Sequence, residues 1–196
     1  LTETISFLGP GQLQVRGAEL SEYAEDQWTL TKRLSINFGA RATSQSNGAA
    51  FAFSPRAGAA YSLAGGKLVF RGGAGMIQGH VPLLGVDFAD NQTRVLDFFS
   101  GPLAGRTITL ANRYFPETGT VPVGPDDLGN SPRTFTWNLE VQTQIWKNIS
   151  FRASYYETHT RDLFDVNPIL PASGSDGTLA LKNTGSSHYR QAEISG

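Results

Sequence analysis

Cysteine is absent from the 196-residue chain, which excludes disulfide bonds, thiolate metal ligands and cysteine nucleophiles. Charge of one sign is not in excess either. The chain has 16 Lys and Arg residues against 17 Asp and Glu residues, for a net charge of −1. This balance offers no basic face for nucleic acid. No run of 18 apolar residues occurs, so the sequence predicts no transmembrane helix.

What is abundant is glycine, with 22 residues, and aromatic side chains, at 11%. This composition favours β-structure with many turns. The sequence begins at Leu1 without an initiator methionine or a signal peptide, and we expect it to be part of a longer protein.

The clearest pattern is an alternation over residues 134–155, TFTWNLEVQTQIWKNISFRASY. Its apolar members are Phe135, Trp137, Leu139, Val141 and Ile145, resuming after a short break with Ile149, Phe151, Ala153 and Tyr155. The residues between them are Thr136, Asn138, Glu140, Gln142 and Gln144, then Ser150, Arg152 and Ser154. A period of two predicts a hairpin with one apolar and one polar face.

The same alternation predicts strands over 34–43, 57–61 and 67–76, with a noisier one over 19–30 and another over 188–194. Three connections are tight, at 31–33, 64–66 and 146–148. The others, 44–55, 79–133 and 159–187, are long and rich in turn-forming residues. Tight and long connections alternate along about seven strands, as in an antiparallel transmembrane β-barrel with short periplasmic turns and long extracellular loops.

The strand length agrees with a membrane barrel. Residues 134–145 would extend about 40 Å at roughly 3.3 Å per residue. Tilted by about 45°, such a strand covers ~28 Å, close to the ~25 Å apolar band of these barrels. We therefore expect the apolar face to contact lipid and the polar face to line a wet lumen.

Aromatic residues stand where the predicted strands end. Trp28, Trp146, Tyr155 and Tyr156 suit the membrane interface, because each ring has an apolar body and a polar tip. The alternative for each is simple packing near a hairpin end.

Five segments resemble, in order, barrel strands of the TonB-dependent receptors. They are YAEDQW (23–28) with LSINFGAR (34–41), SPRAGAAY (54–61), KLVFRGGAG (67–75), PRTFTWNLEVQ (132–142) and ISFRASY (149–155). The last two match the Oar-like branch, which often carries a carboxypeptidase-regulatory-like domain, and YRQAEIS (189–195) also looks like a later strand. Residues 156–161 fit only loosely, and no plug domain or energy-coupling box is visible.

The resemblance implies a 22-stranded barrel in the outer membrane of a Gram-negative bacterium, closed by a plug. Residues 1–196 would then be part of one barrel domain, without the plug. Its partners would be outer-membrane lipid, the plug of the same protein, an unknown cargo, and the TonB complex through the missing N-terminal part. An open sheet leaves edges that lipid does not tolerate, so we expect this segment not to fold alone.

Catalysis and cofactors are not expected, since no nucleophile motif such as G-x-S-x-G is present. His80, His159 and His188 fall in predicted loops or at a loop edge, where a shared metal is one interpretation and solvated histidines are the other. Four acidic residues of the long 79–133 loop could bind calcium or could simply be solvated; they are Asp87, Asp90, Asp126 and Asp127. Their spacing is not that of an EF-hand.

Two sets of residues are candidates for cargo contact. The lumen set is Arg41, Arg71, Asn138, Glu140, Gln142 and Arg152; the loop aromatic set is Phe98, Phe99, Tyr114 and Phe115. For the lumen set, ordinary hydrogen bonding along the wall or to a plug is the alternative.

The function expected from the resemblance is active import of a large or scarce solute. A non-transporting barrel for adhesion or surface architecture is the first alternative, and a soluble carbohydrate-binding β-sandwich is the second.

Overall fold

The computed structural model describes residues 2–12, 14–46, 51–115, 122, 131–147 and 149–196. Ten strands form one open sheet in the order β1-β6-β7-β10-β9-β8-β5-β4-β3-β2. Neighbouring strands pair antiparallel except β7 and β10, which pair parallel. The predicted all-β, mainly antiparallel architecture is confirmed.

The elements in chain order are β1 Glu3–Leu8, β2 Glu19–Thr31, β3 Leu34–Gln45, β4 Ala52–Leu63, η1 Ala64–Gly66, β5 Leu68–Gln78, α1 Leu83–Val86, η2 Phe88–Asp90, β6 Thr93–Phe98, β7 Thr107–Tyr114, β8 Arg133–Trp146, β9 Ile149–Ile169 and β10 Asp176–Ser195. The predicted strands correspond to β2, β3, β4, β5, β8, β9 and β10. Among the described residues, no helix is long and apolar enough to cross a bilayer.

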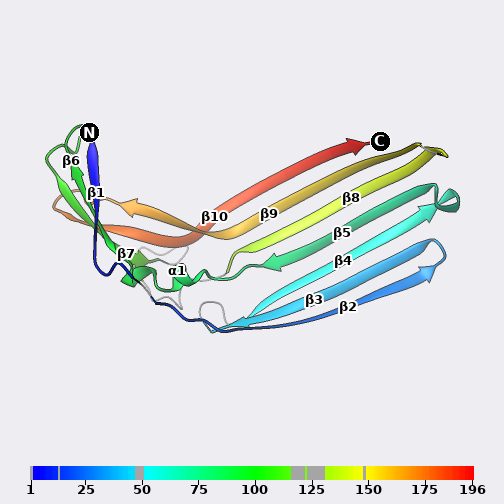
Figure 1. Ribbon diagram of the computed structural model, residues 1–196, viewed down its shortest axis with the longest axis horizontal. Coiled ribbons are helices and arrows are strands. Elements are labelled where there is room, and N and C mark those ends of the chain that lie inside the picture. The colour runs from blue at the N-terminus through cyan, green and yellow to red at the C-terminus, as the bar shows by residue number, and fades with distance from the viewer. Residues whose placement is uncertain (1, 13, 47–50, 116–121, 123–130, 148) are drawn as a thin grey trace.

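Those seven strands run side by side in a long layer (Figure 1). We call this layer the wall and define it as residues 19–45, 52–78, 133–160 and 186–195. The three predicted tight turns lie together at one end of the wall, on the right in Figure 1. The turn between β4 and β5 has positive φ at Ala64 (50°), Gly65 (66°) and Gly66 (94°). The two glycines adopt this backbone without a Cβ clash.

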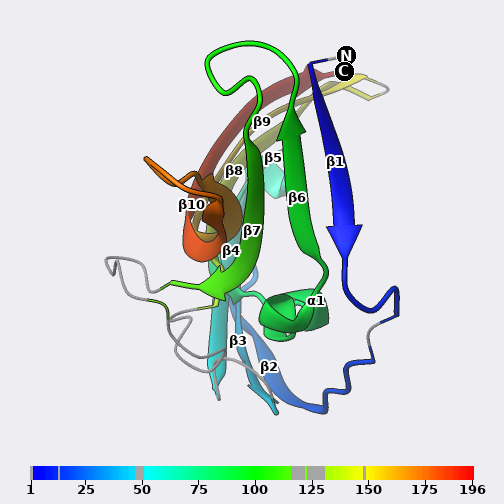
Figure 2. The ribbon, with the colours of Figure 1, turned by 90° about the vertical axis from the view of Figure 1, so that its left-hand side faces the viewer.

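The described parts of the long connections lie at the opposite end, and two of these connections are more structured than predicted. Residues 159–187 are not a loop, because β9 and β10 continue through them as a hairpin. The 79–133 connection contains α1, η2, β6 and β7. With β1 and the distal parts of β9 and β10, these elements form a module that we call the cap, residues 2–8, 83–115 and 161–185 (Figure 2).

The β9–β10 hairpin changes direction where the wall passes into the cap (Figure 1). Asp162 adopts a left-handed φ of 58°, and the pairing of β10 with β9 slips on both sides of Gly185. A Cβ at Gly185 would lie 3.0 Å from the Leu163 carbonyl oxygen. Such irregularities bend a strand pair and increase its twist. Arg133 fixes the bend through Nε and Nη2, at 2.9 and 2.7 Å from Asp162 Oδ2.

The hydrophobic core among the described residues lies in the cap. It consists of Phe88, Ile108, Leu110, Tyr114, Leu179 and Leu181. Every second residue of β7 from Ile108 to Tyr114 is buried, as expected for a strand with one face on a core.

The wall, by contrast, has no second layer packed on it in the described part of the chain. The accessible surface is 12,714 Å², whereas a compact soluble protein of this mass would expose about 9,000 Å². A soluble β-sandwich buries one face of each sheet against another, so the carbohydrate-binding β-sandwich, the second functional alternative, is not supported.

Candidate functional site

The six lumen candidates share one face of the wall. Residues that oppose each other in a ladder point to the same side of the sheet. Arg71 opposes Glu140, and Gln142 opposes Arg152. Through the ladders of β3, β4 and β5, Arg41 and Asn138 fall on that side as well. We call it the polar face, and the opposite side, with Phe70 and Val141, the apolar face.

Three hollows lie over the polar face. The one next to the tight turns measures about 480 Å³, a middle one about 300 Å³, and the one next to the cap about 810 Å³. Their lining side chains include Arg71 in the first, Asn138 in the second and Arg41 in the third. The polar face is therefore the concave side of the wall.

A cluster of charged and amide groups links β5, β8 and β9 on the polar face, in the half nearer the tight turns. Arg71 Nη1 donates to Glu140 Oε1 at 2.6 Å and to Gln142 Oε1 at 2.9 Å. Arg152 Nε lies 3.9 Å from Glu140 Oε2. The structure thus brings four of the six candidates together. Because the Arg71 side chain is 45% exposed, water screens these pairs and each contributes little to stability.

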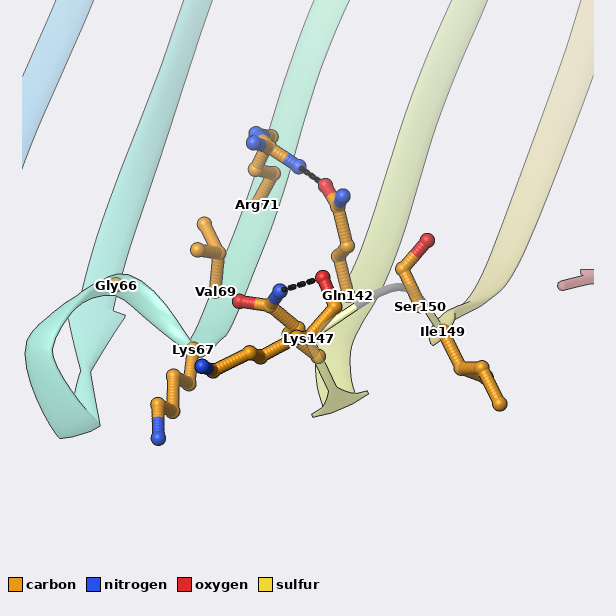
Figure 3. A pocket seen from close by; sticks show the side chains of 9 residues that line it. Gly66, Lys67, Val69, Arg71, Gln142, Lys147, Ile149 and Ser150 are labelled. Carbon is orange, nitrogen blue, oxygen red and sulfur yellow. Dashed lines mark hydrogen bonds between the residues drawn. The ribbon is translucent and has the colours of Figure 1, made fainter.

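The hollow next to the tight turns is positively charged (Figure 3). Its described lining includes the cations Lys67, Arg71 and Lys147 and no carboxylate. Gln144 Nε2 donates to the Lys147 carbonyl at 3.0 Å and holds the turn against β8. Such a lining favours an anionic group, whether from a solute or from another part of a protein.

The largest hollow, next to the cap, holds a second polar network. Arg41 Nη2 donates to Ser21 Oγ at 2.9 Å and lies 3.4 Å from Glu19 Oε1. His80 Nδ1 lies 3.2 Å from the other Glu19 oxygen. Tyr23, 80% exposed, adds an aromatic face to the same hollow. Donors, acceptors and one ring here could hold a polar solute by several directed contacts.

The middle hollow exists because its floor is made of small residues. A Cβ at Gly58 would lie 2.7 Å from Asn37 Oδ1, and one at Gly73 would lie 3.3 Å from Asn138 Oδ1. Because the two glycines carry no Cβ, the side-chain amides of Asn37 and Asn138 can lie over them. Asn138 belongs to this floor, and Arg71 lines the same hollow from its side nearer the tight turns. Among the described residues, no hydrogen bond joins Asn138 to the Arg71 cluster.

The outer membrane beta barrel domain family matches residues 42–193, which is most of the chain. The chain belongs to this family. No curated protein matches the chain. The family points to the outer membrane of Gram-negative bacteria as the location, as predicted.

Family membership orients the barrel wall. In outer-membrane barrels the short turns face the periplasm and the long connections lie outside. The positively charged hollow is therefore near the periplasm, and the cap is extracellular. The convex apolar face is turned to lipid, which explains how it can expose large side chains such as Phe70, Leu139 and Ile194.

The predicted interface aromatics of the barrel fall into three groups. Trp28 and Trp146 lie next to the periplasmic turns, 49% and 67% exposed. Tyr155 is on the apolar face toward the outer end, with its ring 5.1 Å from that of Trp137. Tyr156 is a correction: it opposes Asn138 and Gln191 on the polar face, because neighbouring residues of a strand point to opposite sides.

The loop aromatics also require correction. Tyr114 and Phe115 are 3% and 6% exposed. The Tyr114 hydroxyl donates to the Val86 carbonyl and accepts from the Ala89 amide. Phe98 packs against the cap core. Of this set, Phe99 has the accessible ring, at 58% exposure.

The histidines do not all lie in loops. His159 is in β9 and His188 in β10, directly opposite each other, with ring centroids 5.6 Å apart. His80 is in the hollow next to the cap, with Glu19. The described residues contain no group of three or more His, Cys, Asp or Glu side chains arranged to hold a metal ion.

Asp87 and Asp90 lie together at η2, while Asp126 and Asp127 are outside the described residues. Desolvation raises the pKa of the Asp87 carboxyl, and the charge of Asp90 and a hydrogen bond to it add to this effect.

Sequence reasoning missed several residues that form side-chain hydrogen bonds or ion pairs on the two faces of the wall, among them the Glu25–Arg56 and Glu157–Arg190 pairs. On the polar face these are Glu19, Ser21, Glu25, Thr43 and Arg56; on the apolar face they are Glu157 and Arg190. The signal for Glu19, Ser21 and Glu25 was present, because Leu20, Ala24 and Trp28 already fix the phase of strand β2.

Proposed function

We propose that this chain supplies the wall and extracellular cap of a TonB-dependent receptor that imports a large or scarce solute. The observation that carries the proposal is the series of three hollows along the polar face, from the cap to the periplasmic turns. The two hollows nearer the tight turns expose mainly polar lining surface. The large hollow next to the cap combines charged groups such as Arg41, Arg56 and His80 with apolar side chains such as Met76 and Ile77, a lining that suits a solute with polar and apolar parts. The resemblance of the strand sequences to the Oar-like branch supports the same function.

In this proposal the chain is a binding surface and carries no catalytic step. Cargo first contacts the hollow next to the cap, where the Arg41–Glu19–His80 network lies. The Arg71–Glu140 cluster contacts a plug that closes the lumen. Energy arrives through TonB acting on that plug. Further strands complete the barrel, because the two edges of the wall cannot stay unpaired in lipid.

The test uses the full-length protein in cells. Strains with and without it are supplied with limiting amounts of iron chelates, cobalamin, oligosaccharides or peptides, one class at a time. Uptake of one class should require both the protein and an intact TonB system. Within that class, a double substitution Arg41→Ala and Arg56→Ala should weaken capture, whereas Lys32→Ala with Arg33→Ala at a periplasmic turn should not. Uptake that persists without TonB contradicts the proposal.

A second candidate function is adhesion by a barrel that does not transport. The cap favours it, because the cap has its own core and ends in strand β1, which exposes Ile5, Phe7 and Leu8. Such an edge can add a strand from another protein. A full-length sequence without a plug or coupling box, together with loss of cell attachment when the cap is removed, would favour adhesion over import.

A further inference from the structure

Polar residues interrupt the apolar face at its extracellular end. Two rows of side chains cross β8, β9 and β10 there. One row is Phe135, His159 and His188; the next, toward the periplasm, is Trp137, Glu157 and Arg190. Each row begins with an aromatic residue on β8 and becomes polar on β9 and β10. Two rows further toward the periplasm, Val141, Ala153 and Ile194 are all apolar.

These polar residues form one connected cluster, which we call the rim cluster: Glu157, His159, Arg161, His188 and Arg190. His188 Nε2 and Arg190 Nε lie 2.7 and 3.2 Å from the same Glu157 oxygen. The Tyr155 hydroxyl donates to the other oxygen at 3.0 Å. Arg161 Nε lies 3.5 Å from His159 Nε2 and extends the cluster outward.

The rim cluster carries more positive than negative charge. Arg161 and Arg190 are always cationic, Glu157 is the carboxylate among the five members, and the two imidazoles are at least neutral. Glu157 is 20% exposed in its side chain, whereas Arg190 is 62% exposed. Within the described residues Arg190 reaches Glu157 and His188 through Nε. The outer nitrogens of its guanidinium therefore point into the surroundings as donors.

The depth of the rim cluster in the membrane follows from strand geometry. Trp146, at the periplasmic end of β8, and Trp137 are nine positions apart. At roughly 3.3 Å per residue and a tilt of about 45°, the Trp137 row lies ~21 Å above Trp146. The His159 row lies ~26 Å above it by the same reckoning. Since the apolar band is ~25 Å tall, the rim cluster lies at its extracellular boundary.

The group that meets a convex barrel surface at this depth is the headgroup of the outer leaflet. That leaflet consists largely of a glycolipid whose sugar headgroup carries phosphate. A phosphate accepts several hydrogen bonds and pairs well with guanidinium groups. We propose that the rim cluster binds a phosphate of an outer-leaflet glycolipid, with Arg161 and Arg190 as donors and Trp137 and Tyr155 packed on the acyl chains below.

Native mass spectrometry of the full-length protein in detergent tests the proposal. The protein is titrated with purified diphosphorylated lipid A and with the same lipid after removal of both phosphates. The wild type should prefer the phosphorylated lipid. The double variant Arg161→Ala, Arg190→Ala should bind it about thirtyfold more weakly, since each cation near an anionic surface contributes about 1 kcal/mol, or about fivefold. The matched control Lys32→Ala, Arg33→Ala removes the same charge at a periplasmic turn and should bind as the wild type does.

Heat-modifiable migration in gels shows whether each variant forms its barrel. If the alanine variant does not, Arg161→Lys with Arg190→Lys keeps the charge, loses bidentate geometry and should show intermediate affinity. Equal binding of both lipids, or equal losses in the rim and control variants, overturns the proposal. Displacement of lipid A by inorganic phosphate in large excess would also overturn it, because the site would then take a free anion.

Discussion

The cap should open independently of the wall, and Ile108→Ala is the substitution that tests this. Ile108 is fully buried, at 0% exposure, among Phe88, Leu110 and Leu179. Truncating such a side chain costs about 2 to 5 kcal/mol through lost burial and the cavity left behind. At about 1.4 kcal/mol per tenfold change, the open population of the cap rises between about thirtyfold and a few thousandfold.

Limited proteolysis of the folded protein measures this population. Trypsin sites at Arg94, Arg106 and Arg113 lie in the cap, and cleavage there follows the open population when opening and closing are fast. Ile145→Ala is the matched control, because it makes the same truncation at a 55% exposed position of the wall. We expect faster cleavage for Ile108→Ala alone, with both variants keeping heat-modifiable barrels. Unchanged cleavage would refute a cooperative cap core, and loss of the barrel would refute its independence.

Three further predictions concern the wall and the charge near η2. Because the chain has no cysteine, single cysteines can carry spin labels at Leu139 and Asn138; lipid-soluble quenchers should reach the first and not the second, and the opposite result would reverse the faces of the wall. Gly39→Ala should impair barrel assembly more than Gly58→Ala in a heat-modifiability assay. The new Cβ at position 39 would lie 2.8 Å from the Ala24 backbone oxygen, which cannot move aside, whereas the one at position 58 would lie 2.7 Å from the Asn37 side chain, which can. Asp87→Asn should slow hydrogen exchange of β7 at neutral pH and have no effect well below pH 3.8, the ordinary pKa of the group. The folded state raises this pKa, so ionisation destabilises the cap as pH rises, and a stabilisation that persists in acid would contradict the reasoning.

The wall could be predicted from the sequence because period-two alternation encodes it directly. Phe135, Trp137 and Leu139 identify both the strand and its face, and tight turns such as 64–66 identify the ends. The cap was missed because β7 is one short strand inside a connection rich in glycine and proline, although Ile108, Leu110 and Tyr114 do alternate. Its core depends on Leu179 and Leu181, which are far away in sequence.

The candidate site on the polar face likewise depends on long-range contacts, which are set by the register of neighbouring strands. Arg71 and Glu140 are 69 positions apart, and the pairing of β5 with β8 brings them together. No local pattern predicts that contact. The error at Tyr156 has a different origin, since its ring chemistry fits the interface but its parity in the strand places it in the lumen.

The parallel contact between β7 and β10 has a consequence for the order of assembly. Strand β7 ends at Tyr114, and the segment of β10 beside it begins at Asp176. Everything between, including both strands of the β8–β9 hairpin, must be synthesised before that contact can form. Long-range closure of this kind is slow, because chain entropy is lost before any pairing is gained. Because β8 and β9 are joined by a short connection and pair locally, we expect that hairpin to form before the cap closes on β10.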